Sequence, residues 1–273
     1  MTGSIRWLKT GIFRSTYFKS QALRCLFYSM KKSLLILTGH SKGLGKAILK
    51  KFQSEETFRI IAISRSGSGV PSENLTEVTL DLSDLGALEA GLSKIFPTGD
   101  FEKVILINNA GWIGEVKPVG KLQPAEIRKA MNLNLLAPMI LTDAFVKTYS
   151  ELNGQKIICN ISSGAASKPM AGWAEYCSGK AGLAMFSKVV AADLSAKGFE
   201  VFAVAPGIVD SEMQAEIRTS DPVDFPALDR FRDFKTERKL LPPEAVAEKI
   251  FYLVNNPTLF PDVVQDVRDF ELP

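Results

Sequence analysis

Short apolar segments alternate with longer segments of helical periodicity along residues 33–273. The apolar segments have the length of strands and are rich in Ile, Val and Leu, as in strands that are buried on both faces of a parallel sheet. The predicted strands span 34–38, 59–63, 78–80, 104–107, 156–161, 200–204 and 263–267. A helix follows the first of them through Ile48 and Phe52, and further helices are predicted at 85–95, 125–147, 176–196 and 243–254. The repeated strand–helix units predict an α/β fold, a single-domain, doubly wound, Rossmann-like parallel sheet with helices on both faces.

The segment 208–241 interrupts this alternation. It is rich in Asp, Arg, Pro and Phe, including Phe225, Phe231 and Phe234, and it follows a late strand. Long insertions at such positions are often lids over a substrate site. We therefore predict a lid; the simpler alternative is a surface excursion that covers only its own small core.

Composition limits the possible function. With 273 residues, of which 46% are hydrophobic, the chain can form one core that covers both faces of a sheet. The formal net charge of +3 is too small to indicate binding to nucleic acid, and Lys and Arg are spread along the chain. No apolar run approaches the roughly 18–20 residues of a membrane span. We expect a small-molecule partner, and neither nucleic acid nor a membrane.

Cysteine and histidine are scarce. The three cysteines, Cys25, Cys159 and Cys177, show no CxxC spacing and cannot all pair, which favours a reducing compartment such as the cytoplasm. The single histidine, His40, leaves no His-rich zinc site, and no metal site is predicted.

Residues 1–29 carry five Lys or Arg side chains and no acidic one. This composition is typical of an organelle transit peptide, which would place the protein in mitochondria. Alternatively, translation starts at Met30, directly before the first strand. The sequence thus divides into an N-terminal extension, 1–29, and one domain, 30–273.

A glycine-rich segment, Thr38 to Gly45, joins the first predicted strand to its helix with the pattern GxxxGxG. Glycines allow a tight turn and a close approach of the backbone to a pyrophosphate, whose charge then meets the free N–H groups of the helix N-terminus. We therefore expect this segment to bind a dinucleotide through Gly39, Ser41, Lys42, Gly43, Leu44 and Gly45.

The same residues contain a rival motif, because Gly39 to Gly43 also matches GxSxG, the nucleophile elbow of α/β-hydrolases. In that role Ser41 would need a histidine base later in the chain, and the only histidine, His40, lies inside the motif. The elbow also normally follows several strands, whereas this strand is the first. The pattern therefore favours a dinucleotide-binding loop.

The end of the second predicted strand bears on the choice between NAD and NADP. A carboxylate there binds the ribose 2′-hydroxyl of NAD and repels the 2′-phosphate of NADP. This strand ends at Ser64 and Arg65 without an acid, and Arg65 and Lys42 can both face a 2′-phosphate. We predict NADP(H) as the cofactor.

Tyr176 and Lys180 stand four residues apart on a predicted helix, so their side chains share one face. A phenol ordinarily has a pKa of about 10. A nearby ammonium and a positively charged oxidised nicotinamide both favour the phenolate form, which makes the proton easier to exchange. Ser163 ends a predicted strand thirteen residues earlier and can bring a second hydroxyl to the same carbonyl oxygen. Asn134 lies within a predicted helix, where Asn is mildly unfavourable, which indicates a local function.

In their order and spacing, these motifs resemble those of the short-chain dehydrogenase/reductase family. The resemblance rests on Thr38 to Gly45, Asn108 to Gly111, Ser163, Tyr176, Lys180 and Pro206–Gly207, and it covers the chain from about Ser33 to its end. It implies four catalytic residues, Asn134, Ser163, Tyr176 and Lys180, with Asn134 holding a water in the proton relay. It also implies a homodimer or homotetramer formed through the helices that follow Ala125 and Tyr176.

The resemblance extends the cofactor site to the adenine and nicotinamide ends. Asp81 and Leu82 would contact adenine, and the residues after two later strands would line the nicotinamide cleft. Beyond the glycine-rich segment, the cofactor-binding residues expected are Ser64, Arg65, Asp81, Leu82, Asn109, Ala110, Gly111, Tyr176, Lys180, Pro206, Gly207, Val209 and Ser211.

Two segments, 172–181 and 210–214, resemble the sepiapterin reductases and bacterial benzil reductases, which implies reduction of vicinal dicarbonyls or similar side-chain ketones with NADPH. In sepiapterin reductases an aspartate near the C-terminus anchors the pterin, and Asp266 stands at the matching position; alternatively, Asp266 is an ordinary charge on an edge strand. At the next two positions, where sepiapterin reductases have aromatic residues, this chain has Val267 and Arg268. A diketone is therefore at least as good a candidate substrate as a pterin. The substrate-binding residues expected are Ser163, Gly164, Tyr176, Gly207 and Asp266.

The sequence therefore predicts an NADPH-dependent oxidoreductase that passes hydride to a small carbonyl compound, with Ser163 polarising the carbonyl and Tyr176 donating the proton. A non-catalytic, NADP-sensing protein of the same fold is the alternative. The presence of Ser163, Tyr176 and Lys180 together favours the enzyme, because a sensor has no need of them.

Overall fold

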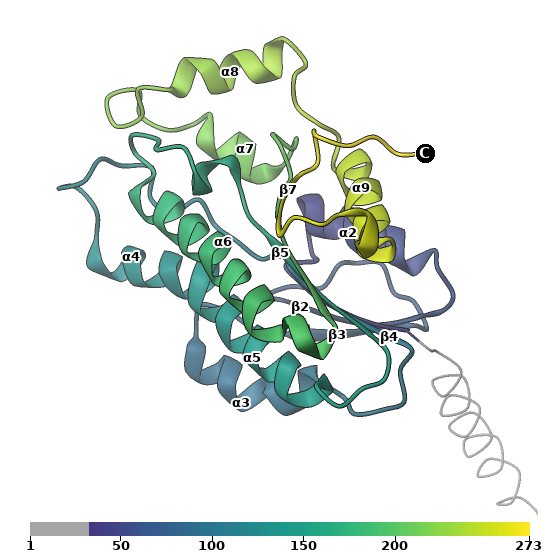
Figure 1. The fold of residues 1–273 in the computed structure, drawn as a ribbon. Coiled ribbons are helices and arrows are strands. Elements are labelled where there is room, and N and C mark those ends of the chain that lie inside the picture. Colours follow the sequence, from purple (N-terminus) through teal and green to yellow (C-terminus); the bar gives the residue numbers. More distant parts are fainter. Residues whose placement is uncertain (1–32) are drawn as a thin grey trace, which may run out of the picture.

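The computed structural model describes residues 33–273, and the predicted extension 1–29 lies outside them. Seven strands form one parallel sheet in the order β3-β2-β1-β4-β5-β6-β7 (Figure 1). The strands are β1 (Ser33–Thr38), β2 (Phe58–Ser64), β3 (Leu75–Thr79), β4 (Lys103–Asn108), β5 (Gln155–Ile161), β6 (Phe199–Ala205) and β7 (Val264–Asp266). The order reverses between β1 and β4, which is the switch point of a doubly wound sheet. The predicted Rossmann-like α/β fold is confirmed.

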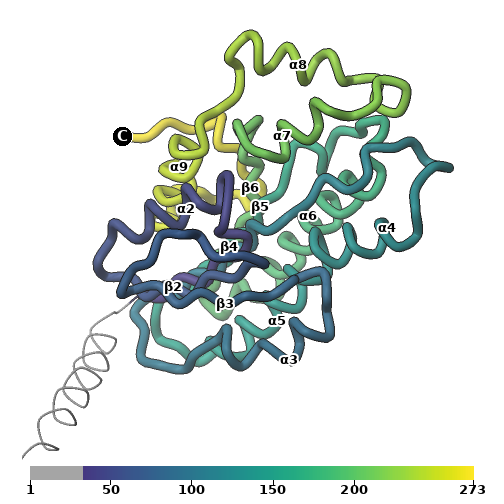
Figure 2. Tube along the Cα trace, turned by 180° about the vertical axis from the view of Figure 1, so that it is seen from behind, coloured from purple at the N-terminus to yellow at the C-terminus, as the bar shows by residue number. Residues whose placement is uncertain are grey.

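Side chains that alternate along each strand divide the core into two layers. In β1, Leu35 and Leu37 belong to the layer under two helices, and Leu34 and Ile36 belong to the layer under three others. The first layer is covered by α2 (Gly43–Gln53) and α9 (Pro243–Asn255), and the second by α3 (Leu85–Ile95), α5 (Ala137–Tyr149) and α6 (Ala174–Leu194) (Figures 1 and 2). Burial on both faces explains why the strands are continuous apolar runs.

The helix predicted at 125–147 is interrupted in the structure. α4 (Pro124–Met131) leads into a π-helical segment, Asn132–Leu136, before α5 begins. Such segments widen the helix locally and occur frequently at functional sites. Here the segment contains Asn134, whose side chain is completely buried. Apolar periodicity does not distinguish a π-helical turn from an α-helical one, so the sequence predicted one continuous helix.

The segment 208–241 forms α7 (Glu212–Ile217) and α8 (Leu228–Thr236), which lie beyond the carboxyl ends of the strands (Figure 1). Its aromatic side chains do not form a core of their own. Phe225 and Phe231 join a cluster with Trp173 and Tyr176 of the main domain, and the rings of Trp173 and Phe225 stack at 5.4 Å. The segment therefore packs onto the main domain, so the alternative that it covers only its own small core is wrong, and its role as a lid stays a prediction.

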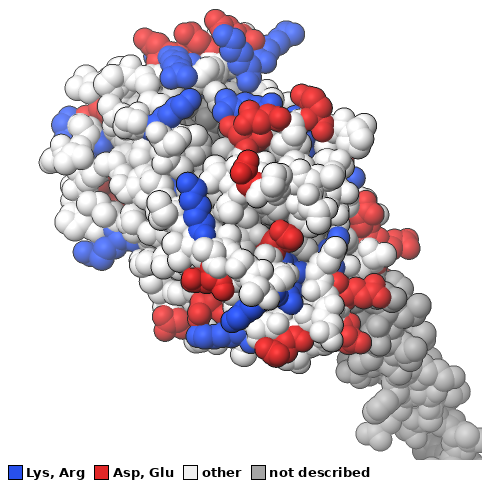
Figure 3. Space-filling view, viewed as in Figure 1, with Lys and Arg blue, Asp and Glu red and all other residues white. Residues whose placement is uncertain are grey.

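The surface agrees with the composition. In the view of Figure 3, Lys and Arg side chains are interspersed with Asp and Glu, and both signs gather over α8. Within residues 33–273, no helix is long and apolar enough to cross a membrane, and no group of His, Cys, Asp and Glu side chains could hold a metal ion.

Candidate active site

A cavity of about 720 Å³ opens at the carboxyl ends of the strands. It is bounded by the residues that follow β1, β2, β4, β5 and β6, which is the edge where doubly wound sheets bind their ligands. Every residue predicted to bind cofactor lines this cavity. Of the other predicted site residues, Ser163 and Gly164 line it as well, whereas Asn134 and Asp266 do not.

The glycine-rich segment forms a cradle that side chains would fill. Gly39 has φ of +71°, and a Cβ added to Gly45 would lie 2.0 Å from the Gly39 carbonyl oxygen and 2.4 Å from Asn109 Nδ2. The Asn109 amide donates to the carbonyls of Thr38 and Gly39 at 3.0 and 3.1 Å, which ties the loop after β4 to the loop after β1. These contacts hold the backbone where a pyrophosphate could approach it.

The N-terminus of α2 also fits a phosphate group. α2 begins at Gly43, and the side chain of the preceding Lys42 makes no capping hydrogen bond. The first N–H groups of a helix have no intrahelical partner and carry the positive end of the helix dipole. Because Lys42, Gly43 and Leu44 all line the cavity, this cradle fits the pyrophosphate of a dinucleotide.

His40 is not placed as a base for Ser41. Its ring is buried, with Nε2 2.7 Å from Oε1 of Glu77 on β3. The same carboxylate oxygen accepts a 2.6 Å hydrogen bond from the Ser68 N–H. His40 therefore holds the glycine-rich segment against β3 and the loop after β2, and this geometry does not support the hydrolase interpretation of GxSxG.

Two cations lie at the end of the cavity near β2. Lys42 Nζ is 2.5 Å from a Glu212 oxygen, with both side chains largely exposed. Arg65 is exposed at the end of β2 and forms no salt bridge within the described chain. Burial opposes ionisation of Asp81, yet hydrogen bonds from Ser83 and the charge of Arg65 hold its pKa below the ordinary value. Arg65 thus stands beside a carboxylate while its guanidinium remains open to a ligand.

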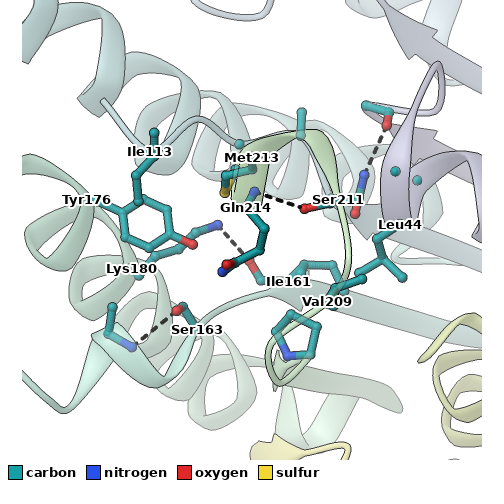
Figure 4. Close-up of a pocket in the computed structure, with 18 of the residues that line it drawn as sticks. Leu44, Ile113, Ile161, Ser163, Tyr176, Lys180, Val209, Ser211, Met213 and Gln214 are labelled. Atoms are coloured by element: carbon teal, nitrogen blue, oxygen red, sulfur yellow. Dashed lines mark hydrogen bonds between the residues drawn. The ribbon is translucent and has the colours of Figure 1, made fainter. Parts of the chain in front are cut away.

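Ser163, Tyr176 and Lys180 meet at the opposite end of the cavity (Figure 4). Ser163 follows β5, and the other two lie one turn apart near the start of α6. Lys180 Nζ lies 5.8 Å from the centre of the Tyr176 ring and donates to the carbonyl of Ile161 at 2.8 Å. The strand end and the helix start therefore bring two hydroxyls and one ammonium to the same space, as their sequence positions predicted.

Burial is the largest cause of the pKa shifts of Tyr176 and Lys180. It raises the pKa of Tyr176, although a hydrogen bond with the Ser163 side chain opposes the shift. It also lowers the pKa of Lys180 to about 8. Without a bound cofactor, the pKa of Tyr176 is therefore raised, whereas a neighbouring ammonium was expected to lower it, because the loss of water outweighs the hydrogen bond with Ser163.

Asn134 lies beside this group without facing the cavity. Its Oδ1 accepts from the Trp112 N–H at 3.0 Å, and its Nδ2 donates to the Trp112 carbonyl at 2.8 Å. A Cβ at Gly111 would lie 3.1 Å from Asn134 Oδ1 and 3.4 Å from Lys180 Nζ, so the two side chains flank this glycine. Asn134 therefore fixes the loop after β4 close to Lys180.

A family model described as short chain dehydrogenase matches residues 33–222. The chain belongs to this family. A benzil reductase ((S)-benzoin forming) of Bacillus cereus is 40% identical over 232 residues, which cover 79% of this chain and 91% of the relative. A sepiapterin reductase of Xenopus tropicalis is 30% identical over 246 residues, covering 81% and 90%. Among solved structures, 4-hydroxyisoleucine dehydrogenase complexed with NADH has a TM-score of 0.67 and 26% identity, covering 86% of this chain and 96% of that one.

This short-chain dehydrogenase is thus an oxidoreductase of a family that binds a nicotinamide cofactor and acts on carbonyl or CH–OH groups. The predicted resemblance to the benzil and sepiapterin reductases is confirmed by both sets of relatives.

In this dehydrogenase the Asp266 carboxylate forms a salt bridge with Arg268. Its Oδ1 accepts from Arg268 Nε at 2.8 Å and its Oδ2 from Arg268 Nη2 at 2.5 Å. These hydrogen bonds lower the pKa of Asp266 despite its partial burial. Arg268, and not Asp266, lines the cavity.

Several residues that line the cavity were not predicted to lie there. Among them are Lys168, Met170, Met213, Gln214, Arg230 and Arg268. Met213 and Gln214 on α7 face the space in front of Tyr176 and Lys180 (Figure 4). The sequence indicated that 208–241 is an insertion near the substrate site, and α7 lies within it. No pattern in this segment shows which of its side chains face the cavity. The direction of Arg268 depends on the course of the chain after β7, which a short edge strand does not reveal.

Proposed function

We propose that this protein is an NADPH-dependent carbonyl reductase that transfers hydride to a vicinal dicarbonyl or a related side-chain ketone. The observation that carries the proposal is the meeting of Ser163, Tyr176 and Lys180 in the cavity that also contains the glycine cradle. Similarity to the benzil reductase of Bacillus cereus, over most of both chains, supports a diketone substrate.

NADPH, when bound, would supply the hydride. The Ser163 hydroxyl would donate a hydrogen bond to the substrate carbonyl oxygen, which withdraws electron density from the carbon that accepts the hydride. As the C–H bond forms and the C=O π bond opens, the Tyr176 hydroxyl would give its proton to the oxygen. Lys180 would stabilise the resulting phenolate, and Asn134 would hold the loop after β4 in position beside it. The carbonyl gains two electrons and two hydrogens, and the product is an alcohol.

The proposed preference for NADPH rests on Arg65 and Lys42. Both line the cavity near the end of β2, where a carboxylate would select NAD. Arg65 has no salt-bridge partner within residues 33–273, and Lys42 pairs only with the exposed Glu212. A 2′-phosphate would give both cations a doubly charged partner.

We further propose that the protein works as a homodimer or homotetramer in the cytoplasm. Apolar side chains are exposed on neighbouring helices, Ile127 on α4 and Met185 and Val189 on α6, with exposed fractions of 37%, 59% and 49%. Met185 and Val189 stand four residues apart on α6 and so share a face, and exposed apolar side chains on one face favour association with a second copy. Cys159 and Cys177, the cysteines in the described chain, are free, which agrees with a reducing compartment.

The experiment that tests this function follows the absorbance of NADPH with benzil, sepiapterin and other diketones as substrates. Benzil is expected to be reduced, and Tyr176→Phe is expected to lower kcat by about a thousandfold while NADPH still binds. Near-normal turnover by that variant would refute the role of Tyr176. A flat trace with every substrate, despite tight binding of NADPH, would favour the non-catalytic NADP sensor.

A further inference from the structure

Three cationic side chains from separate segments line the cavity around the proposed substrate position. Lys168 follows the short 3₁₀ helix after Ser163, Arg230 lies on the lid helix α8, and Arg268 follows β7. The acidic residues that line the cavity, Asp81 and Glu212, lie beside the cations Arg65 and Lys42 that face the other end. Asp266 and Asp269 act on Arg268, whereas Lys168 and Arg230 form no salt bridge among the described residues, so the charge around the proposed substrate position is positive.

Arg268 changes which groups Asp266, the predicted substrate anchor near the C-terminus, is able to bind. A lone aspartate at this position would accept hydrogen bonds from N–H groups of a substrate. In this chain the Asp266 carboxylate binds the Arg268 guanidinium with both oxygens, so its acceptors are already used. The Arg268 side chain packs along Gly207, where its Cγ and Cδ lie 3.7 and 3.6 Å from the position of an added Cβ. The cavity thus receives the guanidinium in place of the carboxylate.

Arg230 and Lys168 form no salt bridge among the described residues. The Arg230 guanidinium lies 5.3 Å from the centre of the Phe234 ring, which orients it without neutralising it. Lys168 is exposed, and its charge acts on Asp266 from a distance, so it reinforces the field set by Arg268. An apolar wall of Met213, Phe231 and Phe234 lies in the same cavity. Cations beside an apolar wall match a molecule with one hydrophobic part and one anionic part.

We propose that the preferred substrate is an aromatic or aliphatic dicarbonyl that also carries a carboxylate, which Lys168, Arg230 and Arg268 recognise. This inference rests on the proposed carbonyl reductase function and names the substrate class for it. The N–H donors of a pterin ring would find no free carboxylate here, because Asp266 is already paired with Arg268. The three cations are distinct from the cradle after β1 and from Arg65, which are proposed to bind the phosphates of the cofactor.

The test compares 4-carboxybenzil with its methyl ester, because the two have similar size and differ in charge. At low ionic strength we expect kcat/KM for the acid to exceed that for the ester by about tenfold. Added salt is expected to reduce this ratio, since charges near solvent are screened over about 8 Å at physiological ionic strength. An acid-to-ester ratio near one, unaffected by salt, would overturn the proposal.

Charge-removing variants assign the effect to the three residues. Lys168→Gln and Arg230→Gln are each expected to lower the acid-to-ester ratio by about two- to fivefold. Arg268→Gln is expected to lower it most, because it also releases the Asp266 carboxylate, and Arg268→Lys should restore part of the loss. Lys197→Gln, which removes an exposed cation that does not line the cavity, is the matched control and should leave the ratio unchanged. A rise in KM for NADPH, with an unchanged ratio, would show that the cations serve the cofactor and overturn the proposal.

Binding separates this inference from the reductase function. The same acid and ester are titrated into the protein with NADP⁺, and binding is followed by tryptophan fluorescence. Tighter binding of the acid, lost in Arg268→Gln, supports the anion site even if neither compound is reduced, in which case only the proposed function fails. Equal binding of acid and ester, with benzil still reduced, overturns the anion site and leaves the reductase function intact.

Discussion

Lys180 Nζ donates a 2.8 Å hydrogen bond to the carbonyl of Ile161, the last residue of β5. This bond ties the ammonium on α6 to the end of β5, and Ser163 lies two residues beyond that strand end. It also supplies one partner for a side chain that is only 4% exposed. The position of the ammonium is therefore set by the sheet as well as by the helix.

The stability of the protein should depend on pH through Lys180. Burial lowers its pKa from 10.5 to about 8, so between these values the unfolded chain binds more protons at this position than the folded one. The free energy of unfolding then rises with pH across that window, by about 1.4 kcal/mol per unit from this group. Lys180→Met should unfold at a higher urea concentration than wild type at about pH 7. Its advantage should shrink as the pH rises above about 8; a constant difference would contradict the assignment.

Activity should depend on pH in the opposite sense. The Lys180 ammonium is present below its pKa of about 8 and is lost above it. We expect kcat/KM for the reduction, which reports the free enzyme, to fall as the pH rises through that value. Lys180→Met should lose activity at every pH while gaining stability. A profile that stays level to about pH 10 would show that the charge of Lys180 is not required.

Arg65→Gln should change the choice of cofactor. The guanidinium stands at the end of β2 with no salt bridge in the described part of the chain, so its removal affects a 2′-phosphate more than a 2′-hydroxyl. We expect KM for NADPH to rise about tenfold, with KM for NADH little changed. Arg128→Gln on α4, outside the cavity, is the control. An equal loss with both dinucleotides would argue against recognition of the phosphate.

Gly45→Ala should abolish cofactor binding. The new Cβ would meet the Gly39 carbonyl oxygen at 2.0 Å, and neither backbone segment can move without opening the cradle. Gly91→Ala on α3 is the matched control, because its nearest contact is an ordinary 3.7 Å to a Leu80 methyl group. That control should stabilise the protein by about 1 kcal/mol. Dinucleotide titration and thermal unfolding of both variants check these outcomes.

Phe225→Ala should loosen the lid. Phe225 is fully buried and stacks on Trp173 at 5.4 Å, next to Tyr176. Loss of a buried phenyl ring costs about 3–5 kcal/mol. Because the ring joins α7 and α8 to the domain, we expect KM for the carbonyl substrate to rise more than KM for NADPH. Similar rises in the two KM values would show that the substitution loosens the whole domain. Limited proteolysis would then show cleavage outside 208–241 as well.

Local patterns in the sequence determined the sheet, the cradle and the catalytic candidates, because each depends on neighbouring residues. Apolar runs mark strands buried on both faces, glycines mark the tight turn before α2, and Tyr176 and Lys180 share a helix face through their spacing. The tertiary structure alone decided what depends on residues far apart in the chain. It placed a π-helical turn at Asn134, where α4, α5 and α6 pack together, and it raised the pKa of Tyr176 through burial. It also paired Asp266 with Arg268 and turned Arg268, Arg230 and Lys168 toward one cavity, since no periodic pattern relates an edge strand, a lid helix and a loop.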